Sequence, residues 1–336
     1  MAVKILQKKD LPCLLGKWSQ SARVLAPARQ DEMTNLAPWE PGAELDLGRN
    51  TWKPLKELFF PRSERMFAYT GDRMNAELSP IDQDHEQTVV FGVRPCDARS
   101  LALLDRVFLD ERFTDDLYKA KRERTVLVGL GCNKPLRSCF CTSVAGDPHG
   151  TEGLDVLFVD TGDEYAVYPL TGRGEALVGE LPEGSGEVEA RASALADLAR
   201  DMMPRYPAEV LPDKLTHMFE HEIWDRIHEK CLGCAACAYL CPTCHCFDVT
   251  DEAKTTEGHR VRNWDSCMFP LFTLHTSGHN PRTSGKQRMR QRIMHKFNYF
   301  PVNSGAIACV GCGRCVEVCP VNTDIREVIS EIGEVK

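Results

Sequence analysis

The sequence has no apolar run that approaches the roughly 18 residues needed to span a bilayer. Its longest apolar pieces are short and lie at residues 88–93 and 125–130. The N-terminus also lacks the hydrophobic core of a signal peptide, because the polar residues 7–10 (Gln-Lys-Lys-Asp) interrupt its few apolar side chains. We therefore expect no membrane span and a cytoplasmic location.

A basic excess is missing as well. The net charge is −8 at pH 7 and the sequence pI is about 5.7, which disfavours a surface built to neutralise phosphates. We expect no nucleic-acid partner. The sequence also lacks a Gly-x-Gly-x-x-Gly after a strand, a P-loop and a serine nucleophile elbow, so nothing in it indicates a self-contained dehydrogenase or hydrolase.

Cysteine, in contrast, is abundant, with 16 in the chain. In a reducing cytoplasm, metal binding explains so many cysteines better than disulfides do. They comprise the isolated Cys13, a loose group of Cys96, Cys132, Cys139 and Cys141, two dense groups at Cys231–Cys246 and Cys309–Cys319, and Cys267 between the dense groups. Their spacing therefore decides which metal to expect.

The two dense groups repeat one motif, C-x2-C-x2-C-x3-C-P, beginning at Cys231 and at Cys309. This spacing is typical of paired [4Fe–4S] clusters, in which three thiolates of a loop bind one cluster and the fourth binds its neighbour. The motifs therefore predict two [4Fe–4S] clusters. The first takes Cys231, Cys234, Cys237 and Cys319, and the second takes Cys309, Cys312, Cys315 and Cys241.

Two other interpretations of these cysteines are weaker. Structural zinc sites usually present cysteines in separated pairs, not four at 2-2-3 spacing followed by proline. The segment Cys241-Pro-Thr-Cys244-His245 also fits the C-x-x-C-H pattern of covalent haem, but Cys241 is already needed by a cluster. Cys244, Cys246 and Cys267 are left over, as buried thiols, part of a partner surface or a further metal site.

The chain divides into two expected domains. Residues 1–207 predict an α/β domain, with buried strands at 89–93 and 126–130, a helix at 98–109 and further strands at 154–159 and 164–170. A turn-rich break at 181–187, a helix at 188–203 and the prolines 204 and 207 suit a linker. Residues 208–336 predict a mainly α-helical ferredoxin-type domain. Its basic helix at 283–296 either places positive charge near the clusters or is a solvated face.

The loose cysteine group lies where open α/β sheets build their sites. Cys96 and Cys132 each follow a predicted strand, and Cys139 and Cys141 come a few residues later. From the residues alone, two interpretations stay open. Either the four thiols converge on a third cluster, or they are scattered structural cysteines.

Several segments together resemble a known family, the beta subunits of soluble NiFe (sulf)hydrogenases and the A subunits of anaerobic sulfite reductases, which are 4Fe–4S dicluster proteins. These segments are 54–61, 92–98, 131–132 with 139–143, 241–248, and 278–282 leading to 295–298. The deazaflavin-reducing hydrogenase beta subunits, which bind a flavin, look like more distant relatives. The resemblance favours a third cluster at Cys96, Cys132, Cys139 and Cys141.

The resemblance implies an electron-transfer subunit of an anaerobic oxidoreductase complex. Such a subunit relays electrons between a flavoprotein subunit, linked to NAD(P)H or ferredoxin, and a catalytic subunit of hydrogenase, sulfite reductase or heterodisulfide-reductase type. An alternative is that the N-terminal domain binds its own flavin or substrate, near Arg94, Asp97 and Arg99, although Arg94 and Arg99 could equally form surface salt bridges with Asp97 or Asp105. A zinc-stabilised interaction module is the third class of function.

Overall fold

A seven-stranded sheet forms the centre of the N-terminal half in the computed structural model, which describes residues 2–71, 75–81 and 86–335. Its strands are β1 (Lys4–Gln7), β2 (Arg23–Gln30), β3 (Met33–Pro38), β6 (Thr88–Val93), β9 (Thr125–Leu130), β10 (Val156–Asp160) and β11 (Glu164–Pro169). They lie in the order β1-β11-β10-β9-β6-β2-β3. The four neighbours β10, β9, β6 and β2 are parallel, so their carboxyl ends share one edge of the sheet.

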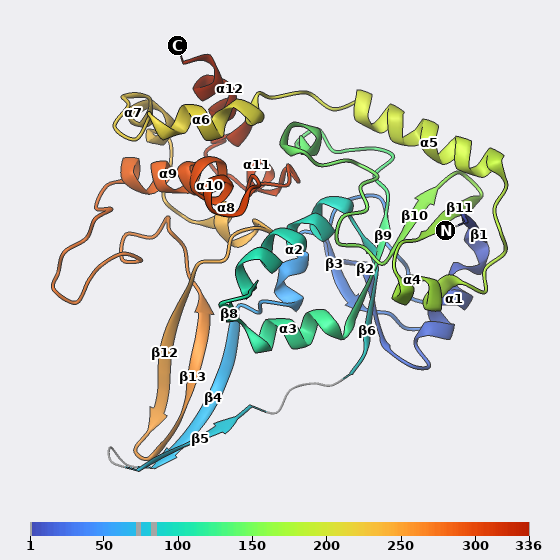
Figure 1. Cartoon of the computed structure of the whole chain (residues 1–336), viewed down its shortest axis with the longest axis horizontal. Helices are drawn as coiled ribbons and strands as arrows, with labels where there is room; N and C mark the ends of the chain where they lie inside the picture. Colours follow the sequence, from blue (N-terminus) through green and yellow to red (C-terminus); the bar gives the residue numbers. More distant parts are fainter. Residues whose placement is uncertain (1, 72–74, 82–85, 336) are drawn as a thin grey trace.

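Helices cover both faces of this sheet (Figure 1). They are α1 (Leu11–Trp18), α2 (Pro95–Phe108), α3 (Asp116–Glu123), α4 (Gly172–Val178) and α5 (Gly186–Asp201). Alternate strand residues face opposite sides: Val89 and Phe91 pack in the core with α1 and α4, whereas Val90 packs in the core with α2, α3 and α5. Every residue of β6 is buried, and all but the first, Thr88, are apolar or glycine, as expected of a strand that is covered on both faces.

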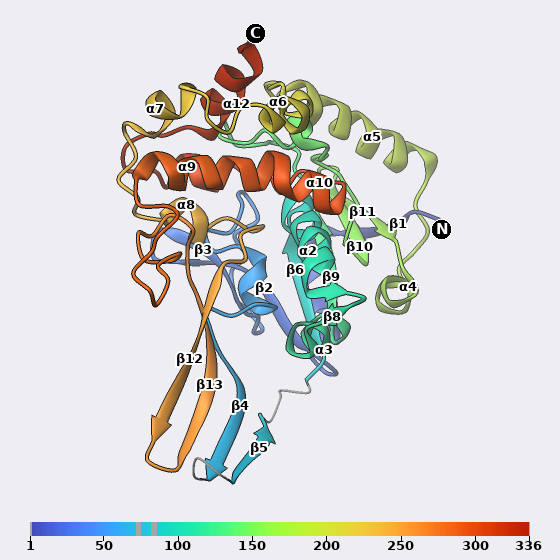
Figure 2. The same cartoon turned by 60° about the vertical axis from the view of Figure 1, so that its left-hand side comes forward.

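A second, antiparallel sheet joins strands from both halves of the chain. Its members are β4 (Ser63–Gly71), β5 (Ala76–Pro80), β12 (Phe247–Lys254) and β13 (Glu257–Trp264), in the order β12-β13-β4-β5. Figures 1 and 2 both show it extending away from the rest of the molecule, so we call it the arm. The outer strands β5 and β12 are exposed along their whole length. A separate small hairpin pairs β7 (Leu109–Asp110) with β8 (Phe113–Thr114).

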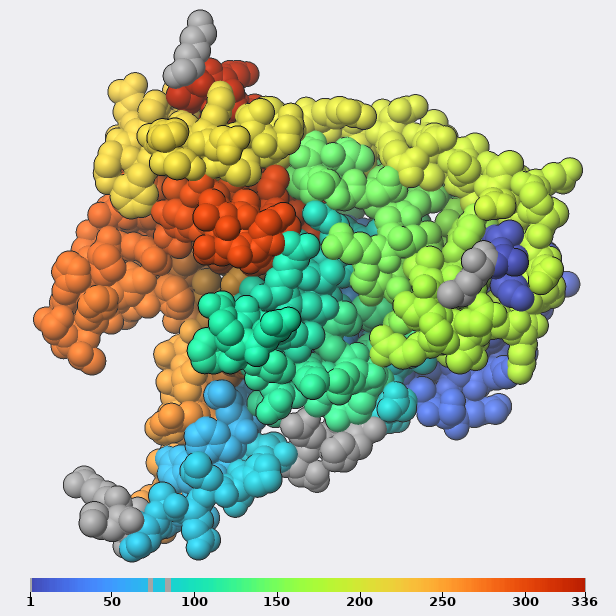
Figure 3. Space-filling model, viewed as in Figure 1, coloured from blue at the N-terminus to red at the C-terminus, as the bar shows by residue number. Residues whose placement is uncertain are grey.

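Short helices and long connecting loops form the remaining C-terminal part, whose orange and red segments pack against the green ones in Figure 3. They are α6 (Leu211–Thr216), α7 (Ile223–His228), α8 (Ala236–Tyr239), α9 (Gly285–Met294), a π-helix (His295–Tyr299), α10 (Phe300–Ser304), α11 (Arg314–Glu317) and α12 (Ile325–Glu334). Ser284 starts α9 with a capping box to Gln287. A mainly helical domain was expected here, and the long hairpin β12–β13 was not.

The predicted elements of the N-terminal half are confirmed: β6, β9, α2, β10, β11 and α5 each overlap the expected ranges. The domain boundary at residue 207 stays a prediction. Core contacts cross it, because Trp264 packs with Phe60, and Leu103 packs with Phe300. Within the described ranges, no helix combines the length and the apolar character needed to cross a membrane.

Candidate iron–sulfur sites

The two dense cysteine motifs have the same local backbone. Gly233 and Gly311, each before the second cysteine of its motif, have φ of 69° and 62°. Ala235 and Gly313, each after that cysteine, have φ of 63° and 77°. The left-handed conformation costs a non-glycine residue roughly 1–2 kcal/mol. Because Ala235 adopts this conformation as well, the two motifs share one loop shape, which does not depend on having glycine at every left-handed position.

The first expected ligand set lies around one cavity. Its walls include all four cysteines of that set, Cys231, Cys234, Cys237 and Cys319. Backbone amides point at two of the sulfurs: Gly233 N–H donates to Cys231 Sγ at 3.4 Å, and Thr323 N–H donates to Cys319 Sγ at 3.1 Å. Such N–H donors stabilise the negative charge of a thiolate-bound cluster, so this cavity fits a [4Fe–4S] group.

The second expected set is also brought together. Cys241 lies close enough to Cys309, Cys312 and Cys315 to interact electrostatically with each. Burial raises the pKa of Cys312 to about 12, and a buried thiol of this kind is stabilised as thiolate only when positive charge, such as iron, is supplied. The structure therefore brings the eight cysteines of the motifs into one region, and their division into two ligand sets of four stays a prediction.

The loose cysteines converge as well. Cys96 follows β6 and Cys132 follows β9, and these strands are parallel neighbours, as the sequence predicted. One cavity is lined by Cys96, Cys132, Cys139 and Cys141 together. Burial raises the pKa of Cys139 to about 11 and that of Cys141 to about 12. The four thiols thus form a compact, enclosed group that is suited to a third cluster.

This third cavity lies directly against the second motif. Cys312 also lines its wall, and the Cys139 thiol lies 3.8 Å from the Cys312 carbonyl oxygen. The Phe140 amide donates to the Gly311 carbonyl at 2.8 Å. A Cβ at Gly311 would lie 2.5 Å from the Cys141 nitrogen, so only glycine permits this approach. The loop of the second motif is therefore a wall shared between two sites.

Buried cations surround the motif cysteines. Arg292 and Lys296, one turn apart at the end of α9 and the start of the π-helix, are only 5% and 3% exposed. Lys296 Nζ lies 3.1 Å from Cys241 Sγ, and Arg292 Nη1 lies 3.9 Å from Cys244 Sγ. Over the described part of the chain, no carboxylate lies within 4.0 Å of either group. The expectation that the basic run places positive charge near the cysteines is confirmed for these two residues.

A buried cation without a counter-charge is costly, and this cost indicates what the site is built for. Burial lowers the pKa of Lys296, but the nearby Cys241 and Cys244 raise it, and the net result lies above the ordinary lysine value. Within the described part of the chain, the negative groups close to Arg292 and Lys296 are cysteine sulfurs, which balance the two cations when they are anionic and metal-bound. This charge pattern, observed in the protein alone, fits anionic iron–sulfur clusters.

The suggested surface pairing of Arg94 and Arg99 with Asp97 or Asp105 is wrong. Arg94 is buried and donates to backbone carbonyls of Leu47, Leu130 and Gly131. Arg99 pairs with Glu152 at 3.1 Å.

Asp97 instead forms a bidentate ion pair with Arg314 of the second motif, at 2.7 and 2.8 Å. Both side chains are 4% exposed. Asp97, together with Arg99, which donates to the Cys309 carbonyl at 3.4 Å, is thus part of the joint between the N-terminal sheet and a cysteine loop, whereas Arg94 binds the carbonyl next to Cys132.

Sequence reasoning missed two functional-site residues. Lys56 is 2% exposed, donates to the Cys244 carbonyl at 2.7 Å and lies 4.0 Å from the centre of the Trp264 ring. Arg314 locks the second motif to Asp97 and to the Thr51 carbonyl. Lys56 falls in the segment 54–61 that carried the family resemblance, but the segment gave no sign that this lysine reaches a cysteine more than 180 residues away.

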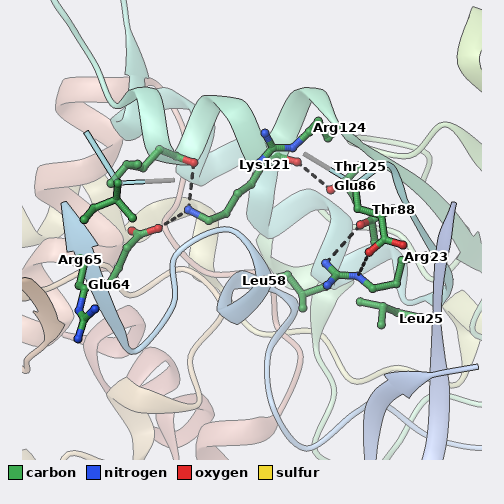
Figure 4. A pocket seen from close by; sticks show the side chains of 12 residues that line it. Arg23, Leu25, Leu58, Glu64, Arg65, Glu86, Thr88, Lys121, Arg124 and Thr125 are labelled. Carbon is green, nitrogen blue, oxygen red and sulfur yellow. Dashed lines mark hydrogen bonds and ion pairs between the residues drawn. The ribbon is translucent and has the colours of Figure 1, made fainter. Parts of the chain in front are cut away.

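A separate cavity of about 360 Å³ lies at the opposite edge of the sheet, where β2, β6 and β9 begin (Figure 4). Its cations are engaged: Lys121 pairs with Glu64, and Arg23 contacts Thr88 at 3.3 Å. Six-residue strands separate this edge from the cysteines by roughly 20 Å. Arg94, Asp97 and Arg99 do not line this cavity, so it does not supply the flavin site suggested for them.

Fold and cysteine geometry together define an iron–sulfur electron-transfer protein built on an α/β framework. Comparison with known proteins agrees: residues 230–323 match the family model of the 4Fe–4S dicluster domain. The chain is also 31% identical over 343 residues to sulfhydrogenase 2 subunit beta of Pyrococcus furiosus, covering 98% of both chains. It therefore belongs to the 4Fe–4S dicluster family that includes this beta subunit.

Proposed function

We propose that this chain is a cytoplasmic relay subunit that passes electrons along a row of three [4Fe–4S] clusters within a larger oxidoreductase. The observation that carries the proposal is the shared wall at Gly311 and Cys312, which belongs both to the second motif and to the cavity of Cys96, Cys132, Cys139 and Cys141. Cys315 of the second motif likewise lines the first cavity. The second site therefore lies between the other two.

The ligand sets follow from this grouping. The first cluster is held by Cys231, Cys234, Cys237 and Cys319, the second by Cys309, Cys312, Cys315 and Cys241, and the third by Cys96, Cys132, Cys139 and Cys141. When bound, the clusters supply one-electron transfer at potentials that the surrounding charge and burial set.

The protein residues have three tasks in this proposal. Arg292 and Lys296 balance the negative charge of the first two sites. Buried Arg94 does the same beside Cys132: burial raises the pKa of Cys132, and the positive charge of Arg94 lowers it in part. The apolar core around the sites excludes water, so charge changes on reduction are felt by these cations and not screened by solvent. The Asp97–Arg314 pair fixes the spacing between the second and third sites.

Partners are inferred from the relative. Because that protein is a subunit of a sulfhydrogenase, we propose that this chain also works beside other subunits. One would be a flavoprotein that exchanges electrons with NAD(P)H or ferredoxin. The other would be a catalytic subunit of hydrogenase, sulfite reductase or heterodisulfide-reductase type. The first site suits an external contact, since Cys234 is exposed.

Anaerobic iron and acid-labile sulfide quantification on the purified chain tests the proposal. We expect about twelve irons per chain, falling to about eight in the Cys96→Ser/Cys132→Ser variant, with one cluster signal lost from the EPR spectrum of the reduced protein. Cys13→Ser, at an exposed cysteine far from these groups in the sequence, is the matched control and should keep all its iron. About eight irons in all three proteins would remove the third cluster. Flavin absorbance in the purified chain would favour the alternative that the N-terminal domain binds its own flavin.

A further inference from the structure

Four cysteines remain outside the proposed ligand sets, namely Cys13, Cys244, Cys246 and Cys267, and the last two lie close together. Cys246 precedes β12 and Cys267 follows β13, so they meet at the base of the arm. The Asp265 amide donates to the Cys246 carbonyl at 3.0 Å and holds the two chain segments together there. Cys246 packs against the same apolar core in which Cys267 is buried, and the two thiols are close enough to interact, which lowers the pKa of Cys246 and raises that of Cys267.

We propose that Cys246 and Cys267 form a redox-active pair that alternates between dithiol and disulfide and exchanges two electrons with the relay. The proposal rests on the function proposed above, since the relay is the source of the electrons. The redox group is a disulfide within the protein, and the reaction requires no external thiol.

The environment of the pair favours this chemistry. Hydrogen bonding by Cys267 lowers the pKa of Cys246 to about 6 in spite of burial, and nearby Lys56 and Lys296 act in the same direction. A thiolate beside a protonated thiol is the arrangement from which disulfides form and reopen. Lys56 is buried, and none of the described carboxylates lies within 4.0 Å of its ammonium group. A thiolate at this place supplies the missing negative charge.

The pair is also next to the relay. Cys244 is close to both: its backbone amide donates to the carbonyl of Cys241, an expected ligand of the second cluster, at 3.4 Å, and its thiol interacts electrostatically with Cys267. A mononuclear metal site is a poorer explanation, since thiolates around one Zn²⁺ all lie about 2.3 Å from the ion and must converge closely. Among residues 2–71, 75–81 and 86–335, no three His, Cys, Asp or Glu side chains converge in this way.

The reaction balances as follows. In reduction, the S–S bond between Cys246 and Cys267 takes two electrons, delivered one at a time by the relay, and one proton, so that Cys246 becomes a thiolate and Cys267 a thiol. In oxidation, the Cys267 thiol loses its proton, the two electrons return to the relay, and the S–S bond closes. The pair would thus store two electrons beside carriers that each take one.

Two measurements on the cluster-containing full-length chain test this. The protein is poised anaerobically at a series of potentials with mediators, quenched with an alkylating reagent, and mapped by mass spectrometry for a Cys246–Cys267 disulfide. We expect the disulfide-to-dithiol ratio to change tenfold per about 30 mV, as for a two-electron couple. Reductive titration should consume about two more electrons per chain than in the Cys246→Ser/Cys267→Ser variant.

Iron content separates the outcomes. The Cys246→Ser/Cys267→Ser variant and the Cys13→Ser control should both keep the full iron of the parent protein. A loss of about four irons in the double variant would show that these cysteines bind a cluster, and would overturn the dithiol. Thiols that stay reduced at every potential would also overturn the proposal. This result comes from the parent protein, so it does not depend on whether a variant folds. A parent protein without clusters would instead overturn the proposed electron-relay function.

Discussion

The first and third cysteine sites present the same kind of ligand in different surroundings. At the first site, Cys234 is exposed and the adjacent Leu232 is 69% exposed. At the third site, Cys139 and Cys141 are 8% and 9% exposed and lie against the second motif. One end of the proposed row is thus exposed on the surface, whereas Cys139 and Cys141 at the other end are held by contacts inside the molecule. A substitution at the third site should therefore also affect the second motif, whereas a substitution at the first site should affect that site alone.

The largest expected effect comes from Gly311→Ala. A Cβ there would lie 2.5 Å from the Cys141 nitrogen and the Phe140 carbonyl carbon, at a φ of 62°. Because backbone atoms cannot yield as a flexible side chain does, we expect the loop of the second motif and the third site to separate. The measurement is iron per chain, which should fall by about eight, together with a loss of roughly 3 kcal/mol or more in unfolding free energy from urea denaturation.

Gly233→Ala is the matched control, since its φ is 69° but its nearest neighbour, the Met268 carbonyl oxygen, is 3.6 Å from the added Cβ. It should lose only about 1–2 kcal/mol through backbone strain and keep the iron of the third site. Equal iron losses in the two variants would mean that the shared wall is no more sensitive than the open loop, and the comparison would fail.

The second largest expected effect is on stability, at the Asp97–Arg314 ion pair that joins the N-terminal sheet to the second motif. Asp97→Asn leaves Arg314 buried without its counter-charge, so we expect a loss of about 3 kcal/mol or more in the unfolding free energy. Glu331→Gln, which breaks the Arg226–Glu331 pair whose side chains are 67% and 39% exposed, should lose less than about 1 kcal/mol. Urea denaturation of both variants measures the difference.

A double variant, Asp97→Leu/Arg314→Met, sharpens this result. Removing both charges leaves no uncompensated ion, so most of the stability should return. If the double variant were as unstable as Asp97→Asn, the cost would come from lost packing and not from the unpaired cation, and the pair would not be the fixing element between the second and third sites.

The same two regions explain how far the sequence could be interpreted. The dense motifs could be predicted because their cysteines are close in the chain, and Cys96 and Cys132 because each follows a buried strand of a parallel sheet. The arm could not. Its strand β12 is exposed on both faces, so it lacks the alternating apolar pattern that marks a half-buried strand. Its partner β13 also pairs with β4, which lies almost 200 residues earlier.

Contacts between charged groups far apart in sequence were equally hidden. Asp97 was considered as a group near a flavin or substrate, or as a surface ion-pair partner, and nothing in the sequence singled out Arg314 or Lys56. Their burial and their partners depend on how the sheet meets the cysteine loops, and neither composition nor local spacing encodes that meeting. The ligand groups could be predicted from local pattern and strand topology, but the cations that support them could not.

The smallest expected effect tests the open end of the row. Leu232→Glu adds a negative charge beside Cys231 at an exposed position, so it should change stability by no more than about 0.5 kcal/mol and leave the iron content unchanged. It should lower the reduction potential of one cluster by about 20 mV, because a charge at roughly 7 Å in water-like surroundings contributes about 0.5 kcal/mol. EPR-monitored redox titration measures the shift, and 1 M salt should abolish it because surface charges are then screened. Leu78→Glu, on strand β5 of the arm and 68% exposed, is the matched control and should shift none of the clusters. A salt-insensitive shift, or equal shifts in both variants, would mean that the first site is not the solvent-exposed end of the relay.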